Sequence, residues 1–301
     1  IGVHGALINC NCSTWNVMKT NQIHLKLKDH AVSGDAFELR YDDSRALLYT
    51  YPKPTLSALS SYYPETNYIS HTNQRRSLFD VLYHVVRYVS VKRKLRLLKP
   101  FQPKDGSLLD IGAGTGYFLR AAKNSGWDVT GIEPNASART LANSKEPNTV
   151  FGSETLQHLT PQSFDVITLW HVLEHLPDLD NDLKLFKKLL KPNGRIIIAV
   201  PNFKSFDALY FKDYWAAYDV PRHLWHFSQQ SITYVFSEIQ MKLESTHPLL
   251  MDAYYVSLLS NKLKTGSHRL LSSLRIGFLS NLKALKSGEY SSLIYVLKNK
   301  N

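Results

Sequence analysis

Three glycines at alternate positions make residues 108–119 the part of the sequence best suited to binding a ligand. Gly112, Gly114 and Gly116 follow an apolar stretch and precede a helical pattern in the segment LLDIGAGTGYFL. Glycine allows positive φ and a close approach of ligand to backbone, and the amides that begin a helix attract carboxylates and phosphates. Dinucleotide-binding folds use the same physics, so the loop alone leaves the ligand open.

Two carboxylates near the loop narrow the choice of ligand. Asp110 lies two residues before the first glycine, at the expected carboxyl end of a strand. A negative charge there disfavours a pyrophosphate and suits an ammonium group such as that of a methionine moiety. Glu133 ends the next expected strand, 21 residues after Gly112, where an acid can accept hydrogen bonds from two ribose hydroxyls. If the glycines served only for close packing and Glu133 were an ordinary surface residue, only part of this combination of glycines and acids would be explained.

Histidines and one acid follow a later apolar segment, which ends at Trp170. His171, Glu174 and His175 would share one face if a helical turn begins there. They match the His-x-x-Glu-His pattern of inverted zinc peptidases, in which two histidines and an acid hold zinc. A zinc hydrolase would leave the glycine loop and Glu133 without a role, so we rank that alternative low.

The histidines are also candidate bases. The pKa of histidine lies near ~6.5, which suits it to take a proton from a reacting hydroxyl or amine. We name His171, His175 and His223 as candidate catalytic residues, with His226 next. For each of them a structural role has about equal weight.

Nine aromatic side chains lie between positions 203 and 227, directly after an expected strand end. Such a segment is typical of a lid or of the wall of an acceptor pocket, although a small separate core would explain it as well. Aromatic stacking could also accept RNA bases. No recognisable RNA-binding motif accompanies it, so nucleic acid is a less favoured partner.

The elements that position these residues alternate regularly after Pro103. Short apolar strands interleaved with helices predict a parallel sheet covered on both faces. We expect strands at 107–111, 128–132, 149–151, 164–169, 195–200, 242–246 and 291–298, with late helices at about 253–264 and 268–286.

Upstream of Pro103 the sequence predicts a separate N-terminal region. Residues 37–41 and 46–50 read as a small hairpin, and a long basic helix runs from about Ser77 to residue 98. Because Met18 looks like a natural start, we expect residues 1–17 to be a non-native or disordered extension.

From Leu108 to about Pro201 the chain resembles class I S-adenosylmethionine-dependent methyltransferases, the broad group that includes the ubiquinone-pathway O-methyltransferases. A narrower bacterial group of uncharacterised methyltransferases is similar over nearly everything from Met18 on. The matching segments are the glycine loop, GIEP at 131–134, SFDVI at 163–167, VLEHL at 172–176 and LLKPNG at 189–194, and, for the narrower group, KDH at 28–30, YISH at 68–71 and DVPRHLWHFS at 219–228.

The resemblance implies an α/β, Rossmann-like, doubly wound sheet of seven strands with the last antiparallel, and S-adenosylmethionine as the cofactor. Residues 104–301 would be the methyltransferase domain, with an aromatic insertion at 202–227 and a helical insertion at 253–287, and residues 18–103 the N-terminal hairpin and basic helix. Asp110 would meet the amino group, Gly112 and Gly114 would pass under the methionine part, and Glu133 would bind ribose. The implied cofactor-binding residues are Asp110, Gly112, Ala113, Gly114, Gly116, Glu133, Pro134, Glu154 and Trp170, with Glu154 or Thr155 near adenine.

Some relatives carry Glu-x-x-Glu-His at this turn and use it to bind a divalent ion that holds substrate oxygens. This chain has His171 at the first position, which weakens a magnesium site because imidazole suits zinc-like metals better. His223 and His226 could supply further ligands. We assign no metal and favour packing, substrate-orienting or base roles.

The predicted function is methyl transfer to a small-molecule, saccharide-linked or lipid-linked acceptor, with oxygen as the expected nucleophile. A non-catalytic binding protein that keeps the fold is the alternative from another class. The net charge of +11 is concentrated at 84–104 and after residue 261, which favours anionic partners, a peripheral anionic membrane among them. No apolar run is long enough to span a bilayer and no secretory signal is recognisable, so we expect a cytoplasmic protein.

Overall fold

The structure is a computed structural model that describes residues 22–63 and 89–300. Its largest element is a seven-stranded sheet in the order β10-β11-β8-β7-β4-β5-β6, with β11 antiparallel to both of its neighbours. The chain reverses its direction of winding at β4, which lies between β5 and β7, and ligands bind at such a switch point. The predicted fold class is confirmed. The strands are β4 (Ser107–Ile111), β5 (Asp128–Ile132), β6 (Val150–Phe151), β7 (Phe164–Trp170), β8 (Leu190–Pro201), β10 (Met241–Pro248) and β11 (Ser292–Asn299).

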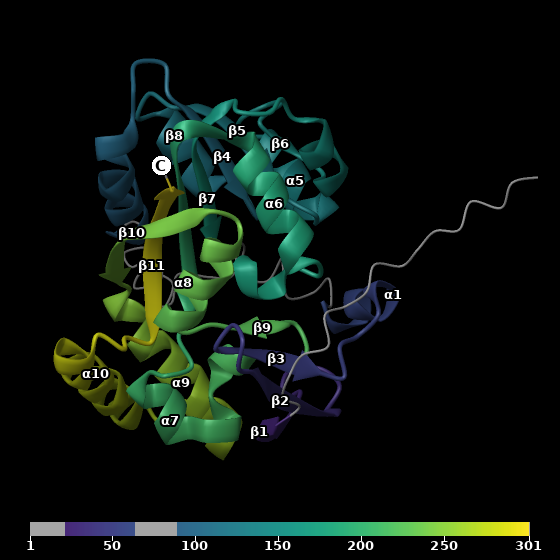
Figure 1. Ribbon diagram of the computed structural model, residues 1–301. Helices are drawn as coiled ribbons and strands as arrows, with labels where there is room; N and C mark the ends of the chain where they lie inside the picture. Colours follow the sequence, from purple (N-terminus) through teal and green to yellow (C-terminus); the bar gives the residue numbers. More distant parts are fainter. Residues whose placement is uncertain (1–21, 64–88, 301) are drawn as a thin grey trace, which may run out of the picture.

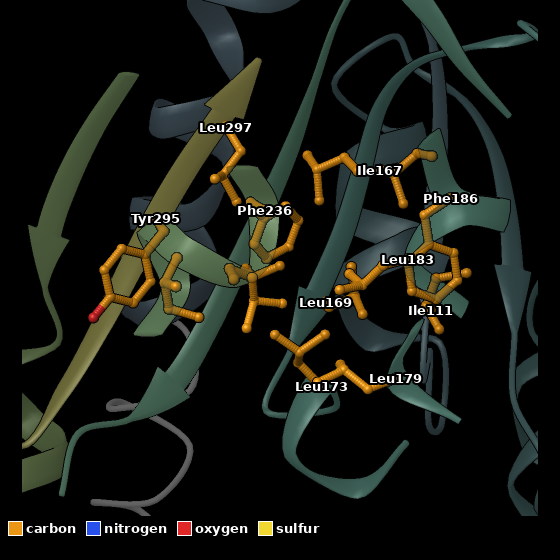
Figure 2. Packing of buried hydrophobic residues seen from close by; sticks show 14 of the residues in the cluster. Ile111, Ile167, Leu169, Leu173, Leu179, Leu183, Phe186, Phe236, Tyr295 and Leu297 are labelled. Atoms are coloured by element: carbon orange, nitrogen blue, oxygen red, sulfur yellow. The ribbon is translucent and has the colours of Figure 1, made fainter. Parts of the chain in front are cut away.

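Alternate residues of the central strands point into two hydrophobic cores, one on each face of the sheet. On one face, Phe186 of α6 and Phe236 of α8 pack in the cluster that contains Ile167 (Figure 2). The neighbouring residue Val166 belongs to the opposite core, which α4, α5 and the helical residues 89–98 cover. The covering helices are α4 (Tyr117–Lys123), α5 (Ala136–Asn143), α6 (Leu179–Leu189) and α8 (Gln229–Glu238), and short 3-10 turns are η2 (Lys99–Phe101) and η3 (Ser153–His158).

A second, four-stranded antiparallel sheet contains the predicted hairpin. Strands β2 (Ala36–Asp42) and β3 (Leu47–Tyr51) pair as expected, but β1 (Gln22–Lys28) and β9 (Trp225–His226) complete the sheet in the order β1-β2-β3-β9. Because β9 comes from the aromatic segment, the N-terminal region is joined to the main domain by a strand pair. Short helical turns follow it at α1 (Leu56–Leu59) and η1 (Ser60–Tyr62).

Three helices and the small sheet lie below the lower end of the main sheet in Figure 1, where its parallel strands end. They are α7 (Phe206–Phe211), α9 (Leu250–Thr265) and α10 (Leu270–Ser287), together with the 3-10 turns η5 (Lys212–Tyr214) and η6 (Ala216–Tyr218). A third core, which contains Phe37, Leu48, Trp215 and Val256, joins the small sheet to the aromatic segment and to α9. The aromatic segment is therefore both a core and a cover for the sheet's carboxyl ends.

Two predicted elements differ in extent. Strand β8 begins at Leu190, several residues before the predicted 195–200, and a register shift in its pairing with β7 accommodates the extra residues. Of the long basic helix, residues 89–98 are helical, and its earlier part and the YISH segment lie outside the described residues, as does the expected extension 1–17. Among the helices that are described, none has the length and apolar character needed to cross a bilayer.

Candidate active site

The loop between β4 and α4 uses several of its own amides. Gly112 and Ala113 both donate to the Ile132 carbonyl, at 2.7 and 2.9 Å. Gly114 donates to Glu133 Oε2 at 2.8 Å. These three amides are therefore not available to a carboxylate or phosphate, whereas the expectation about the amides that begin the helix concerns α4, which starts at Tyr117.

The three loop glycines all have positive φ, of 74°, 70° and 53° for Gly112, Gly116 and Gly114. A side chain at Gly112 would collide with Val172, and one at Gly116 would come within 2.9 Å of Ala142. At Gly114, by contrast, a Cβ atom would have nothing within 4 Å. Gly112 and Gly116 thus allow packing, while Gly114 leaves open space beside the two acids.

Asp110 and Glu133 are both buried, but they accept hydrogen bonds from different kinds of donor. Asp110 accepts a 2.6 Å hydrogen bond from Thr168, and burial raises the pKa of its carboxyl to about 7, partly opposed by this bond and by Lys94. Glu133 accepts from Gly114 and, through Oε1, from the Asn135 amide at 2.9 Å. The carboxylates end neighbouring strands, as the sequence predicted.

A lysine that sequence reasoning did not single out lies at the same place. Lys94 Nζ lies 4.2 Å from the centre of the Trp170 ring and 5.6 Å from that of Phe118, which is a cation–π arrangement. Burial lowers the pKa of Lys94 to about 8, against the attraction of Asp110 and Asp252. Trp170 Nε1 is buried and has no hydrogen-bond partner in the described part of the chain. The site therefore holds two donors beside Asp110.

His171 is held between two carboxylates. Its Nδ1 lies 3.4 Å from Glu174 Oε1 and its Nε2 lies 3.2 Å from Asp252 Oδ2. Hydrogen bonds and charge from Asp252 and Glu174 outweigh burial and hold the pKa of His171 well above its ordinary value. At neutral pH it is an imidazolium, so it can donate hydrogen bonds but has no free lone pair.

The three residues of the His-x-x-Glu-His pattern do not form one set. The turn is the short 3-10 helix η4 (Leu173–His175), and among the described residues the group that could hold a metal is Glu174, His175 and His223. Their potential ligand atoms all lie within 4.8 Å of one another. His171 is not part of it, which contradicts the single face expected from helical spacing.

Both histidines of this group have a defined tautomer. His175 Nδ1 lies 3.0 Å from the Arg222 carbonyl, and His223 Nδ1 lies 2.9 Å from the Ala217 carbonyl. Since a carbonyl only accepts, each Nδ1 carries a proton, and Nε2 is the nitrogen that has the lone pair in the neutral form of each ring. Burial and the neighbouring His223 lower the pKa of His175 to about 4, so it is neutral at neutral pH.

Glu174 completes the group with an unusual carboxylate. Its side chain is 1% exposed, and in the described part of the chain its oxygens have the His171 imidazolium, at 3.4 Å from Oε1, as an ionic partner but no closer hydrogen-bond donor. Charge from His171 lowers the pKa of this carboxyl despite burial. A buried charge with unused lone pairs, beside two imidazole lone pairs, can serve a cation or a protonated ligand group.

A family model described as a methyltransferase domain matches residues 82–246, more than half of the chain. The chain belongs to this methyltransferase family. The family predicted from the sequence is thereby confirmed.

Curated relatives of this methyltransferase match its central part. The ubiquinone biosynthesis O-methyltransferase of Serratia proteamaculans is 31% identical over 105 residues, which are 33% of this chain and 44% of that protein. The enzyme of the same name from Coxiella burnetii is 32% identical over 111 residues, 34% of this chain and 47% of that protein. The chain thus spans less than half the length of these relatives.

Solved structures share the fold at low identity. Magnesium protoporphyrin IX methyltransferase from Synechocystis, with bound S-adenosylhomocysteine, has a TM-score of 0.55 and 13% identity, covering 82% of this chain and 100% of that one. Geranyl diphosphate C-methyltransferase from Streptomyces coelicolor has a TM-score of 0.50 and 14% identity, covering 77% of this chain and 89% of that one.

Two segments of this methyltransferase that are far apart in sequence meet behind the histidines. Arg222 donates to Asp29 at 3.0 Å and, through Nη2 and Nε, to Asp219 at 2.6 and 3.0 Å. Asp29 also accepts backbone amides of its own loop, and these bonds with Arg222 lower the pKa of its carboxyl to about 2 despite burial. The KDH and DVPRH segments are therefore one structural unit, which holds the backbone directly before His223.

The remaining predicted residues are less informative. Pro134 and Glu154 are exposed, and Glu154 begins η3 directly after β6, so its placement near adenine stays a prediction. His226 lies 3.1 Å from Thr50, whose hydroxyl donates to the His223 carbonyl, so His226 Nε2 must be the donor. Burial lowers its pKa well below the ordinary value. It is a neutral structural residue.

Proposed function

We propose that this chain transfers a methyl group from S-adenosylmethionine to an oxygen of a small-molecule, saccharide-linked or lipid-linked acceptor. Membership of the methyltransferase family supports the reaction class. The observation that carries the proposal is the open space at Gly114, in the loop that follows the buried Asp110 and whose Gly114 amide donates to the buried Glu133. Two acids favour a cationic nucleoside over a dinucleotide, because they would repel a diphosphate.

The residues present fit the parts of this cofactor. Asp110 would accept from the ammonium group, and Lys94 and Trp170 Nε1 would donate to the carboxylate of the methionine part. Glu133 accepts one amide through each of its oxygens and would accept from the ribose hydroxyls as a carboxylate. Gly114 would let the ligand pass close to the backbone.

Bound S-adenosylmethionine supplies an activated methyl group, so the chain must align the acceptor, exclude water and remove a proton. His175 or His223 would take that proton at Nε2, since each holds its Nδ1 proton on a backbone carbonyl. His171, already an imidazolium, would orient Glu174 and Asp252 and is not the base in this proposal. The aromatic segment 203–227, which carries His223, would cover the acceptor.

The same residues support a second use of the site. Glu174, His175 and His223 offer one carboxylate and two imidazoles, a donor set that suits a zinc-like divalent cation. Such an ion would polarise an acceptor hydroxyl and lower its pKa. The Glu174 oxygens favour this version, because their ion pair with His171 is long, at 3.4 Å, and the described residues offer them no closer donor.

Metal titration followed by elemental analysis tests this second use. We expect zinc or manganese binding that His223→Ala weakens by about tenfold or more, as loss of one ligand does. His158→Ala, at an exposed position, is the matched control. Metal that is lost in His171→Ala but retained in His223→Ala would instead support the His-x-x-Glu-His zinc reading and contradict this site.

The main proposal is tested by calorimetry and by a methyl-label assay. We expect S-adenosylmethionine and S-adenosylhomocysteine to bind, Asp110→Asn to weaken both, and nicotinamide dinucleotide to bind poorly or not at all. Extracts incubated with methyl-labelled cofactor should yield a labelled product that mass spectrometry identifies. Binding without any transfer would support the non-catalytic alternative, and tighter binding of the dinucleotide would overturn the cofactor assignment.

A further inference from the structure

Helix α10 exposes the side that carries large apolar residues and buries the side that carries mostly small residues. Its buried face consists of Ser273, Ile276, Gly277, Ser280 and Ala284, which pack against α9 and α7. On the opposite side, large apolar residues recur every three or four positions and are exposed, up to 84% for Leu271 and 71% for Leu285. This stripe, called the α10 stripe below, consists of Leu271, Leu274, Phe278, Leu282 and Leu285.

The α10 stripe continues onto the start of α9. The Asn281 side chain donates to the Leu250 carbonyl at 2.9 Å, and Gly277 lies against Tyr254, so the second half of α10 runs beside the first half of α9. Leu250 and Met251 are exposed there as well. Figure 1 shows α10 at the lower left edge of the molecule. Scattered exposed leucines need no explanation, but a continuous stripe on one helix does.

Apart from Asp252 in the first turn of α9, which pairs with His171, the helical hairpin that carries the stripe has only positive charges. Residues 253–288 contain six lysines or arginines and no aspartate or glutamate. Arg275, Lys283 and Lys286 lie on α10 itself, and Lys283 Nζ lies 4.0 Å from the centre of the Phe206 ring. A partner for this surface must therefore be both apolar and negatively charged.

We propose that the α9–α10 hairpin docks on an anionic lipid surface, with α10 lying in the plane of the interface. The α10 stripe would enter the boundary between headgroups and acyl chains, and Arg275 and Lys286 would meet the headgroup phosphates. A second copy of the chain is a poorer occupant, because two hairpins of the same positive charge would face each other.

The docked hairpin is coupled to the active site at two points. Asp207 of α7 is fully buried and accepts from Ser280 of α10 and from Trp215, at 2.7 and 2.8 Å, so it ties α10 to the aromatic segment. Asp252, in the first turn of α9, pairs with His171. Docking does not depend on the methyl transfer, but it would bring a lipid-linked acceptor to the covered end of the sheet.

Vesicle co-sedimentation at low salt tests the docking. We expect the whole protein to bind vesicles with about 30% phosphatidylglycerol in phosphatidylcholine, and to bind pure phosphatidylcholine about tenfold or more weakly. The variant Phe278→Ser/Leu282→Ser and the variant Arg275→Glu/Lys286→Glu should each lose about tenfold in partitioning. Ile23→Ser on β1 and Lys184→Glu/Lys188→Glu on α6 are matched controls, since their residues are exposed elsewhere.

Circular dichroism and light scattering make the outcome decisive. All variants should keep the wild-type helical signal, because the changed residues are exposed, and all should be monomeric. Equal vesicle binding by the α10 and control variants would overturn the proposal. So would a dimer that dissociates in Phe278→Ser/Leu282→Ser, which would assign the stripe to a second copy. Binding of S-adenosylmethionine should be measured on the same variants. Its result tests the proposed function separately, because vesicle docking does not require cofactor binding.

Discussion

Gly112, Gly114 and Gly116 have the same spacing and the same sign of φ, but different surroundings. Alanine at Gly112 would meet the Val172 side chain in addition to the backbone strain of positive φ. We expect Gly112→Ala to lower the free energy of unfolding by about 3 kcal/mol, combining overpacking with left-handed strain. Gly114→Ala should cost only about 1 kcal/mol, from strain alone.

For cofactor affinity we expect the larger effect at Gly114, whereas for stability the larger effect is at Gly112. A methyl group at Gly114 occupies the open space, so S-adenosylhomocysteine should bind at least about tenfold more weakly. Gly34→Ala is a matched control, because Gly34 also has positive φ, of 76°, and nothing within 4 Å, but lies in the turn between β1 and β2. Urea unfolding and calorimetry measure the two quantities. Equal affinity in Gly114→Ala and Gly34→Ala would show that no ligand passes over Gly114.

The histidine group predicts a pH-dependent contribution to stability. The pKa of His175 is about 4 in the folded chain and near its model value of 6.5 in the unfolded chain. As pH falls from 6.5 towards 4, the unfolded chain takes up a proton that the folded chain refuses, so this contribution is full above pH 6.5 and is lost below it. Relative to His175→Asn, the wild type should lose about 2 kcal/mol between pH 7 and pH 4.5. Urea unfolding at both pH values measures it, with His158→Asn as the control, and a constant difference would contradict the burial of His175.

At the scale of elements, the small sheet and the aromatic segment depend on Arg222. Its guanidinium is the ion-pair partner of Asp29, whose side chain is fully buried. Arg222→Met should lower the free energy of unfolding by about 3 kcal/mol, because it leaves a buried carboxylate without its cation. Denaturant unfolding measures this loss, and Asp29→Asn in the same background should restore part of it. Additive losses in the double variant would argue against direct coupling.

Most elements of the main sheet could be predicted from sequence, because their signals are local. Strands β4 and β5 have the predicted bounds, since short apolar runs between turns define a buried strand. Strand β1 alternates but is mostly exposed, so it has no hydrophobic pattern that marks a face. Strand β9 has two residues and exists only because β3 lies beside it. Neither carries a signal that a single sequence can show.

The candidate site was predictable only where spacing along the chain determines position. Asp110 and Glu133 end adjacent strands of a predicted sheet, so their proximity follows from topology. Lys94 and Asp252 lie on helices, and the sequence did not show where these helices pack against the sheet. The basic residues at 84–104 stand out in the sequence, but their position in the fold does not. The three residues of His-x-x-Glu-His were assigned to one face because a helix was assumed, and positive φ at His171 breaks that periodicity.

Over the whole molecule, charged side chains form a line from the proposed cofactor site to the proposed acceptor site. Lys94 interacts electrostatically with Asp110 and Asp252, and Asp252 pairs with His171, which pairs with Glu174. These residues come from the helix at 89–98, from β4, from α9 and from η4. A ligand that enters at Asp110 therefore meets groups whose protonation depends on several elements at once. Cofactor binding should accordingly be linked to pH.

The pH dependence of cofactor affinity follows from two pKa values, about 7 for Asp110 and about 8 for Lys94. Below pH 7 Asp110 is protonated and must release its proton to meet an ammonium group, so affinity should fall by about tenfold per pH unit. Above pH 8 Lys94 is neutral and no longer attracts a carboxylate, so affinity should fall again. Calorimetry with S-adenosylhomocysteine should thus give a maximum between these values.

Variants of the two residues separate the two limbs of that curve. Asp110→Asn should bind weakly but lose the acid limb, because the amide does not titrate. Lys94→Arg should keep its affinity near pH 7.5 and lose the alkaline limb, because a guanidinium stays charged throughout the range. An alkaline limb that persists in Lys94→Arg would belong to the amino group of the ligand, and Lys94 would then have no part in binding it. An acid limb that persists in Asp110→Asn would likewise remove Asp110 as the partner of the ammonium group, because the limb would then belong to another group.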